Sequence, residues 1–497
     1  MTAVEEVTNP YLDRCQRSEG VLSEVEVLLG ERFDLEAYAT ELDWMMLRGG
    51  DTGPADMGRF ERLRDFPGFP ESFQPHFYQR SPEDTQGGIR PTPLEVLTLP
   101  DGRTVYDKRE DTHEAVRAFK VRGALFAVLD AVAEHPEVRV FTTASTGNHA
   151  KGILYAVNML NRALVESGAV RVNSYGEVHP DDAGQLFRAD IYCTNKLDPE
   201  KREALENGGG RLIDRFSTLE EAMPAAQIAA KNDKSGRTAF IHPFNVENVI
   251  AGQGTIALEL LLQMAAAGVN LRETPINLRV AVGGGGLYTG QQAVFRWAID
   301  RGLLHPNSRV TAVEAENNDS ANRELTGKPA LKAHQLSHLA GGIATLQSGG
   351  LTVPVIGAYS HHGVQVVSEA SMALAAEQLG RAHNGILPEF AGAVSLASVM
   401  QYLPDEVAAD LSDVTITCGG NASARVAHDL AVKLSDHQDT RVAEAAAYIK
   451  SRVFPTLSFQ ILAATLNPVE VAPHPFSPER AARPRLRVIG QSFTSKD

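Results

Sequence analysis

From about residue 90 onward, short apolar stretches rich in β-branched residues alternate with longer amphipathic segments. Examples of the apolar stretches are VRVFTTAS and SRVTAVEAE, and helical patterns such as LYTGQQAVFRWAIDRG lie between them. This alternation is typical of parallel strands joined by crossover helices. The pattern therefore predicts an α/β fold with parallel-type sheets flanked by helices.

The two ends of the chain differ from this pattern. Residues 1–89 combine two helical patterns, around 20–30 and 35–48, with a stretch rich in Gly, Pro and aromatic residues. Such helix breakers favour irregular backbone that packs on another unit. We expect an extension that orders the fold or contacts another subunit, with a cap over a site as the alternative. Residues 422–497 are mixed and include a strand candidate, ARPRLRVIGQSF.

The charge balance argues against a nucleic-acid partner. The 497 residues include 47 Lys and Arg against 62 Asp and Glu, a formal net charge of −15, and there is no long basic run. Binding to DNA or RNA depends on neutralising phosphates, so an acidic chain is a poor candidate for it. A local pocket can still bind an anionic small molecule, because net charge does not describe a single site.

Cysteine use and hydropathy favour a cytoplasmic enzyme. The three cysteines, Cys15, Cys193 and Cys418, are widely scattered, which fits neither a disulfide framework nor a zinc half-site. The acidic start of the sequence contains no apolar run, so we expect no secretory signal. No stretch approaches about 18 continuous apolar residues, so we expect no membrane partner.

Four consecutive glycines form the strongest local signal. Gly283 to Gly286 follow an apolar run and precede a helical pattern that begins near Leu287. Glycine lets a backbone approach a ligand closely, and the first N–H groups of a helix attract anions. The segment has neither the Walker pattern nor a clean GxGxxG fingerprint. Taken alone, it fits either a phosphate site or a tight strand-to-helix turn.

A second candidate site is the segment TTASTGNHAKG, where a predicted strand gives way to a helix. Ligands collect at this edge of an open α/β sheet. Backbone N–H groups there, with Ser145, Thr146 and Asn148, suit a carboxylate. The alternative is a plain helix cap, in which the serine or asparagine side chain satisfies the first turn.

Two single residues complete the set of candidates. Lys120 lies between Phe119 and Val121. A partly desolvated lysine can lose its proton and form a Schiff base, whereas a lone lysine is usually a solvated surface charge. Cys418 follows a predicted strand in TITCGGNAS, and a buried cysteine is usually a small apolar filler.

The joint order of these candidates resembles that of the fold-type II pyridoxal-phosphate enzymes. Lys120, the Ser145–His149 loop, the Gly283–Gly286 loop and Cys418 follow one another as in that family, and the threonine/serine dehydratase branch is the most similar. The words RPTPLEV, AFKVRGA, HPFNVENVIAGQGTIALEL and EFAGAVSLASV strengthen the resemblance.

The resemblance covers residues 90–421 and implies the tryptophan-synthase-β-like, two-lobed architecture of a single catalytic body. A small lobe, at roughly 138–215, would be inserted in the large lobe. Residues 1–89 would be an N-terminal extension, and residues 422–497 a C-terminal extension that completes the large lobe.

Roles for individual residues follow from the same resemblance. Lys120 would hold pyridoxal 5′-phosphate as a Schiff base and then remove the α-proton of the substrate. The implied cofactor-binding residues are Phe119 at the pyridine ring, Asn148 at the 3′-oxygen, Gly283, Gly284, Gly285 and Gly286 around the phosphate with Leu287 at the helix start, and Cys418 at the ring nitrogen. The implied ligands of the substrate carboxylate are Ser145, Thr146, Gly147 and His149.

The reaction that the resemblance implies is β-elimination from a serine- or threonine-like amino acid, giving a 2-oxo acid and ammonia. The cofactor provides the electron sink for such chemistry. A thiol is a weak, neutral partner for the ring nitrogen. It suits rapid loss of a β-substituent better than a long-lived carbanion. A homo-oligomer, dimer or tetramer, is also implied.

Departures from the family pattern keep other functions open. Ala118, Thr146 and Lys151 stand where this branch usually has a serine, a small residue and a glutamine, and they lie on the substrate side. The alternatives are a β-replacement synthase, an enzyme similar to diaminopropionate ammonia-lyase, and a cofactor-binding protein without turnover. Glu314 matches a cation-binding position of some relatives, but Ser320 replaces the second carboxylate, so we predict no metal.

Overall fold

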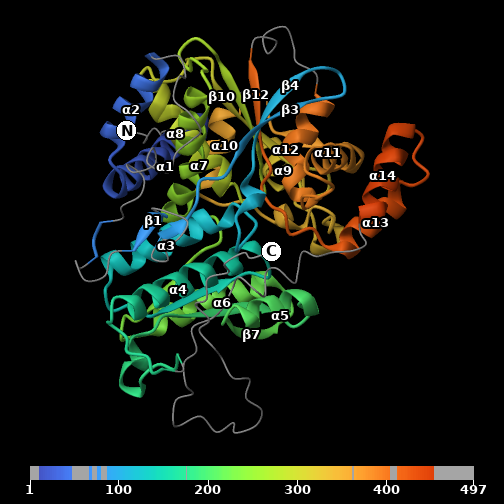
Figure 1. Cartoon of the computed structure of the whole chain (residues 1–497). Coiled ribbons are helices and arrows are strands. Elements are labelled where there is room, and N and C mark those ends of the chain that lie inside the picture. Colours follow the sequence, from blue (N-terminus) through green and yellow to red (C-terminus); the bar gives the residue numbers. More distant parts are fainter. Residues whose placement is uncertain are drawn as a thin grey trace, which may run out of the picture.

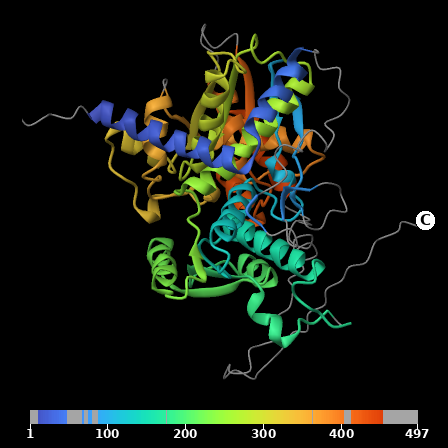
Figure 2. The ribbon, with the colours of Figure 1, turned by 90° about the vertical axis from the view of Figure 1, so that its left-hand side faces the viewer.

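Two sheets, each covered by helices, give the molecule two lobes (Figures 1 and 2). The smaller lobe contains α4, α5, α6 and β7 and lies at the bottom of the view in Figure 1. The structure is a computed structural model, and it describes residues 10–47, 67–69, 75–79, 87–174, 176–360, 363–402 and 411–452.

The large lobe is built on a six-stranded sheet with the order β11-β10-β9-β12-β4-β3. Neighbouring strands are parallel except for the antiparallel pair β3–β4. All six residues of the central strand β9 are buried, as is typical of a parallel strand covered on both faces. The strands are β3 (Leu94–Thr98), β4 (Thr104–Lys108), β9 (Ile276–Ala281), β10 (Arg309–Ala315), β11 (Gln365–Val367) and β12 (Ser412–Ile416).

The small lobe is built on a four-stranded sheet that is parallel throughout, with the order β7-β6-β5-β8. Its strands are β5 (Val140–Ala144), β6 (Arg188–Thr194), β7 (Arg211–Phe216) and β8 (Thr238–Phe240). Because β8 pairs with β5 after helix α6 has crossed over, this sheet extends beyond the 138–215 range that the resemblance implied.

Ten helices are described in the catalytic body. They are α3 (Lys120–Glu134), α4 (Asn148–Glu166), α5 (Pro199–Asn207), α6 (Leu219–Asn232), α7 (Glu247–Ala266), α8 (Gly286–Asp300), α9 (Ser320–Thr326), α10 (Thr352–Tyr359), α11 (Glu369–Ala382) and α12 (Phe390–Gln401). Helix α3 packs against α4 and α7, and α7 packs against α8, so one buried apolar cluster runs from one lobe into the other. The predicted α/β class is confirmed, as are the expected helices after Gly147 and near Leu287.

Helix α7 has the length and hydropathy of a membrane span. It is the one helix of the described residues with both properties, with a mean hydropathy of 1.4 over its 18-residue window. In the fold 89% of that window is buried, because α1, α3 and α8 surround it. Helix α7 is therefore a core helix of this structure.

The N-terminal residues contain the two predicted helices, α1 (Pro10–Arg32) and α2 (Leu35–Leu47). Helix α1 packs along α7, α8 and α10, and its Arg32 forms a buried ion pair of 2.8 Å with Asp130 of α3. A short parallel pair follows, β1 (His76–Tyr78) and β2 (Gly87–Ile89). Most of the Gly- and Pro-rich stretch between α2 and β1 lies outside the described residues.

After Asn421 the chain continues as α13 (Ala424–Leu434) and α14 (Thr440–Arg452). These two helices pack on each other and on α11, at the edge of the large lobe (Figure 1). The strand candidate ARPRLRVIGQSF lies outside the described residues. That residues 422–497 complete the large lobe thus stays a prediction.

Candidate active site

A cavity of about 910 Å³ is lined by residues of both lobes. The strands β5, β9 and β12 end beside it, at Ala144, Ala281 and Ile416, and the loops that follow them form much of its wall. Carboxyl ends of parallel strands are where ligands bind in open α/β sheets. The topology thus brings all four sequence candidates, far apart along the chain, to one place.

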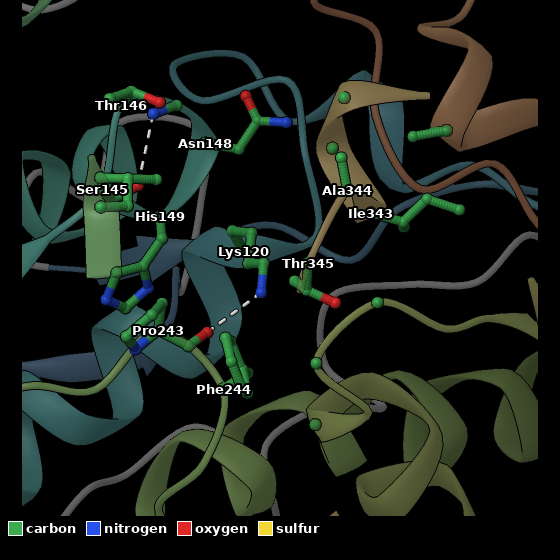
Figure 3. A pocket seen from close by; sticks show the side chains of 18 of the residues that line it. Lys120, Ser145, Thr146, Asn148, His149, Pro243, Phe244, Ile343, Ala344 and Thr345 are labelled. Atoms are coloured by element: carbon green, nitrogen blue, oxygen red, sulfur yellow. Dashed lines mark hydrogen bonds between the residues drawn. The ribbon is translucent and has the colours of Figure 1, made fainter. Parts of the chain in front are cut away.

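Lys120 is the first residue of α3, and its side chain extends into this cavity (Figure 3). Its Nζ donates a hydrogen bond of 3.0 Å to the backbone carbonyl of Pro243, which follows β8. The Phe119 ring lies beside it, with 5.0 Å between Nζ and the ring centroid. Burial lowers the pKa of Lys120 to about 8. The amine is therefore close to losing its proton at neutral pH, as a nucleophilic lysine requires.

The glycine loop connects β9 to α8 along the large-lobe wall of the cavity. Gly285 has a φ of +86° at the N-cap of α8, and no side chain caps this helix. A Cβ at Gly284 would overlap the ring of Phe244, and one at Gly286 would lie 2.6 Å from the Phe244 carbonyl oxygen. The backbone is therefore packed too closely for any other residue. An uncapped helix start beside a cavity leaves N–H donors for a phosphate.

The Ser145–Gly147 loop connects β5 to α4 and lies on the small-lobe side of the cavity (Figure 3). The Gly147 N–H donates to Ser145 Oγ at 3.3 Å, but no side chain caps α4. The plain helix cap considered from the sequence is therefore not what forms. The first N–H groups of α4, together with the hydroxyls of Ser145 and Thr146, can receive a carboxylate.

His149 lines the cavity below this loop and is 3% exposed. Burial, with the positive charge of Lys120 and the neighbouring His242, holds the pKa of His149 well below its usual range. Its imidazole is therefore neutral at physiological pH. It contributes a polar, uncharged surface on the small-lobe side of the cavity.

Cys418 lies beyond the end of β12, is 4% exposed and also lines the cavity. The Cys418 thiol donates to the carbonyl of Ile416 at 3.4 Å. The backbone carbonyl of Cys418 accepts a hydrogen bond of 3.0 Å from the backbone N–H of Phe119. Burial raises the pKa of the thiol well above its usual range. The group is a neutral thiol that offers weak hydrogen bonding only.

Glu389 is a cavity residue to which the sequence analysis assigned no role. It lies at the N-cap of α12 and accepts a hydrogen bond of 2.8 Å from Asn148 Nδ2. Asn421 donates to the other end of the same amide, Asn148 Oδ1, at 2.8 Å. The signal for Glu389 was present in EFAGAVSLASV, where a lone carboxylate precedes an apolar helix.

Glu314, the candidate cation ligand, is used by the backbone. Its carboxylate accepts from the N–H groups of Ala321 and Asn322, each at 2.9 Å, at the start of α9. Burial raises the pKa of Glu314 to about 8. Within the described residues no group of three or more His, Cys, Asp or Glu side chains could hold a metal ion.

A family model described as "Pyridoxal-phosphate dependent enzyme" matches residues 85–419, more than half of the chain. The chain belongs to this family. It is 28% identical over 342 residues to the L-threonine dehydratase biosynthetic IlvA of Corynebacterium glutamicum, covering 67% of this chain and 68% of that protein. It is 28% identical over 324 residues to the L-threonine ammonia-lyase of Geobacter sulfurreducens, covering 65% and 69%.

Comparison with solved structures supports the same family and fold. A T.th. threonine deaminase is 28% identical, with a TM-score of 0.52 over 67% of this chain and 94% of that chain. The diaminopropionate ammonia lyase of Escherichia coli, at 19% identity, a TM-score of 0.53 and coverage of 69% and 88%, shows the fold alone. The predicted family and fold are therefore confirmed, and pyridoxal phosphate is the cofactor of this enzyme.

The residues of the cavity fit that cofactor. The uncapped start of α8 offers N–H donors to its phosphate, and Lys120 offers a buried amine to its aldehyde. In this assignment Phe119 and Cys418 would hold the ring, because both line the same cavity. The individual residue roles remain predictions.

Proposed function

We propose that this enzyme converts a serine- or threonine-like β-hydroxy amino acid into a 2-oxo acid and ammonia. The substrate loses a proton from Cα and hydroxide from Cβ, and the water released is taken up again when ammonia leaves. Threonine would give 2-oxobutanoate. The names of the relatives at 28% identity, L-threonine dehydratase and L-threonine ammonia-lyase, support this proposal.

The observation that carries the proposal is the placement of Lys120 between the two uncapped helix starts. Its Nζ lies in the cavity that both the glycine loop and the Ser145–Gly147 loop line. With a pKa of about 8, the amine can take up a proton and return it near neutral pH. The cofactor, when bound, supplies the electron sink for cleavage at Cα.

The small-lobe side of the cavity would orient the substrate. The N–H groups at the start of α4 and the hydroxyls of Ser145 and Thr146 would hold the carboxylate, which fixes Cα relative to Lys120. His149 is neutral and would add no charge at this end. The neutral thiol of Cys418 would leave the ring nitrogen without a charged partner, which favours prompt loss of the β-hydroxyl.

The test is a panel of β-substituted amino acids given to the purified, cofactor-loaded protein. Serine, threonine and 2,3-diaminopropionate are offered singly, and ammonia and the 2-oxo acid are both quantified. We expect equal amounts of the two products from serine or threonine. Turnover of diaminopropionate alone would instead support the ammonia-lyase alternative.

Candidate nucleophiles, such as sulfide, are then added with the same substrates. A new amino acid detected by mass spectrometry in place of the oxo acid would support the β-replacement alternative. A protein that binds the cofactor and yields no product from the whole panel would contradict the proposed function.

We also propose that the enzyme works in the cytoplasm as a homo-oligomer. The scattered cysteines and the resemblance to fold-type II enzymes support these two expectations. Light scattering on the cofactor-loaded protein gives the particle mass directly. A mass equal to the 53.7 kDa of one chain would contradict the homo-oligomer.

A further inference from the structure

The side-chain amide of Asn148 is held at both ends. Asn421 donates to its Oδ1, and its Nδ2 donates to Glu389, both at 2.8 Å. An amide nitrogen carries two hydrogens, so one N–H of Asn148 remains for a group in the cavity. Three separate elements cooperate here, namely the start of α4, the N-cap of α12 and the loop after β12.

This orientation depends on the charge of Glu389. An ionised carboxylate can only accept, so it binds the NH₂ end of the Asn148 amide. A protonated carboxyl can donate, and the amide could then turn over and present its oxygen. The direction in which Asn148 offers its N–H is therefore coupled to the ionisation of Glu389.

Burial in this wall of the cavity works against the ionised form. It raises the pKa of Glu389 above its usual value, and three cations oppose the shift. The charged or titratable groups that face Glu389 are Lys151 on α4, Lys201 on α5, Arg117 in the loop before α3, Lys120 on α3 and Cys418 after β12.

Lys151 is the most effective of these cations. Its charge has the largest opposing effect on Glu389, it is 3% exposed, and it lies one helical turn after Asn148 on α4. Lys201 is exposed at the rim, where solvent weakens its influence.

We propose that Lys151 is a positioning residue for the cofactor: it keeps Glu389 ionised, and Glu389 in turn fixes Asn148 with an N–H available to the 3′-oxygen of pyridoxal phosphate. The proposal rests on the cofactor of the family and holds whichever amino acid reacts. It predicts that the pH range of cofactor binding depends on the charge of Lys151.

The test measures cofactor affinity against pH by the visible absorbance of the lysine-bound cofactor. In the natural enzyme, affinity is expected to change near pH 8, where Lys120 and Lys151 titrate, and to weaken again at a lower-pH midpoint that Glu389 sets. Lys151→Gln should move this midpoint up by about 1 pH unit, as expected when a nearby opposite charge is removed. Lys151→Arg keeps the charge and should keep the original midpoint.

The double variant Lys151→Gln/Glu389→Gln separates positioning from packing. Its glutamine at 389 does not titrate, so the lower-pH midpoint should disappear. The change near pH 8 that Lys120 causes is common to all variants and is not the midpoint that is compared.

An unchanged lower-pH midpoint in Lys151→Gln, or a lower-pH midpoint that persists in the double variant, would overturn the proposal. Circular dichroism melting shows whether each variant folds. Should Lys151→Gln fail to fold, Glu389→Gln alone decides the matter, because a lower-pH midpoint that survives in it also overturns the proposal. Substrate turnover is not used, so failure of the proposed reaction would leave this result intact.

Discussion

The two strand-to-helix turns that face the cavity are similar in topology and opposite in construction. The turn after β9 consists of Gly283 to Gly286, and the ring and carbonyl of Phe244 leave no space for a side chain at Gly284 or Gly286. The turn after β5 carries two hydroxyls, and a Cβ added at Gly147 would meet nothing within 4 Å. Both turns begin a helix that no side chain caps.

This difference in construction fits two different ligands, a phosphate that never changes and an amino-acid substrate that does. A phosphate is the same in every cycle, so a backbone packed against Phe244 can be fitted to it once. An amino-acid substrate needs contacts that side chains can adjust, and the turn at Ser145 and Thr146 has room for them. We infer that changes at the turn after β9 will affect cofactor binding, and that changes at the turn after β5 will affect substrate binding.

The largest effect is expected at Lys120, which lies between the two turns. Lys120→Ala removes both the amine that binds the cofactor and the proton acceptor. We expect turnover to fall by at least about 1,000-fold, within the range of a lost catalytic base and nucleophile. The visible absorbance of the lysine-bound cofactor should also vanish. An unchanged spectrum would show that another lysine holds the cofactor.

Adding a methyl group at each turn tests whether the two turns have separate tasks. Gly284→Ala forces its Cβ into the Phe244 ring, and we expect cofactor affinity to fall by about 100-fold, the upper range for overpacking. Gly147→Ala places its Cβ in open space and is the matched control, with cofactor affinity retained. Equal losses in the two variants, measured by absorbance titration, would mean that the turns do not divide the tasks.

The sequence indicated the candidate residues of this site through their joint order along the chain. The four glycines and Lys120 were each ambiguous when taken alone, whereas the alternating pattern was enough to indicate the α/β class. Glu389 could not be predicted in this way, because its role depends on Asn148, which is 241 residues away. The extent of the small lobe was missed for a similar reason, since β8 pairs with β5 across α6.

The charge state of Lys120 gives a pH-dependent test of the same cavity. The neutral amine attacks the aldehyde of the cofactor, and burial lowers the pKa of Lys120 to about 8. The rate of cofactor uptake by the apoenzyme should therefore rise about tenfold per pH unit below pH 8 and level off above it, because a single proton must be lost. Stopped-flow absorbance gives this profile. A rate still rising at pH 10 would indicate an ordinary, exposed lysine.

The smallest effect is expected at Thr146. A substitution there tests the turn after β5 alone. Thr146→Val removes one hydroxyl and keeps the shape of the side chain. We expect KM for the amino acid to rise about fivefold, equivalent to the roughly 1 kcal/mol of one net hydrogen bond. Thr146→Ser retains the hydroxyl and should stay close to the natural enzyme. Cofactor affinity should be the same in all three proteins, because Thr146 lies on the opposite lobe from the glycine loop. A loss of cofactor in Thr146→Val would instead place this side chain against the cofactor, and the substrate would then be held by the backbone of α4.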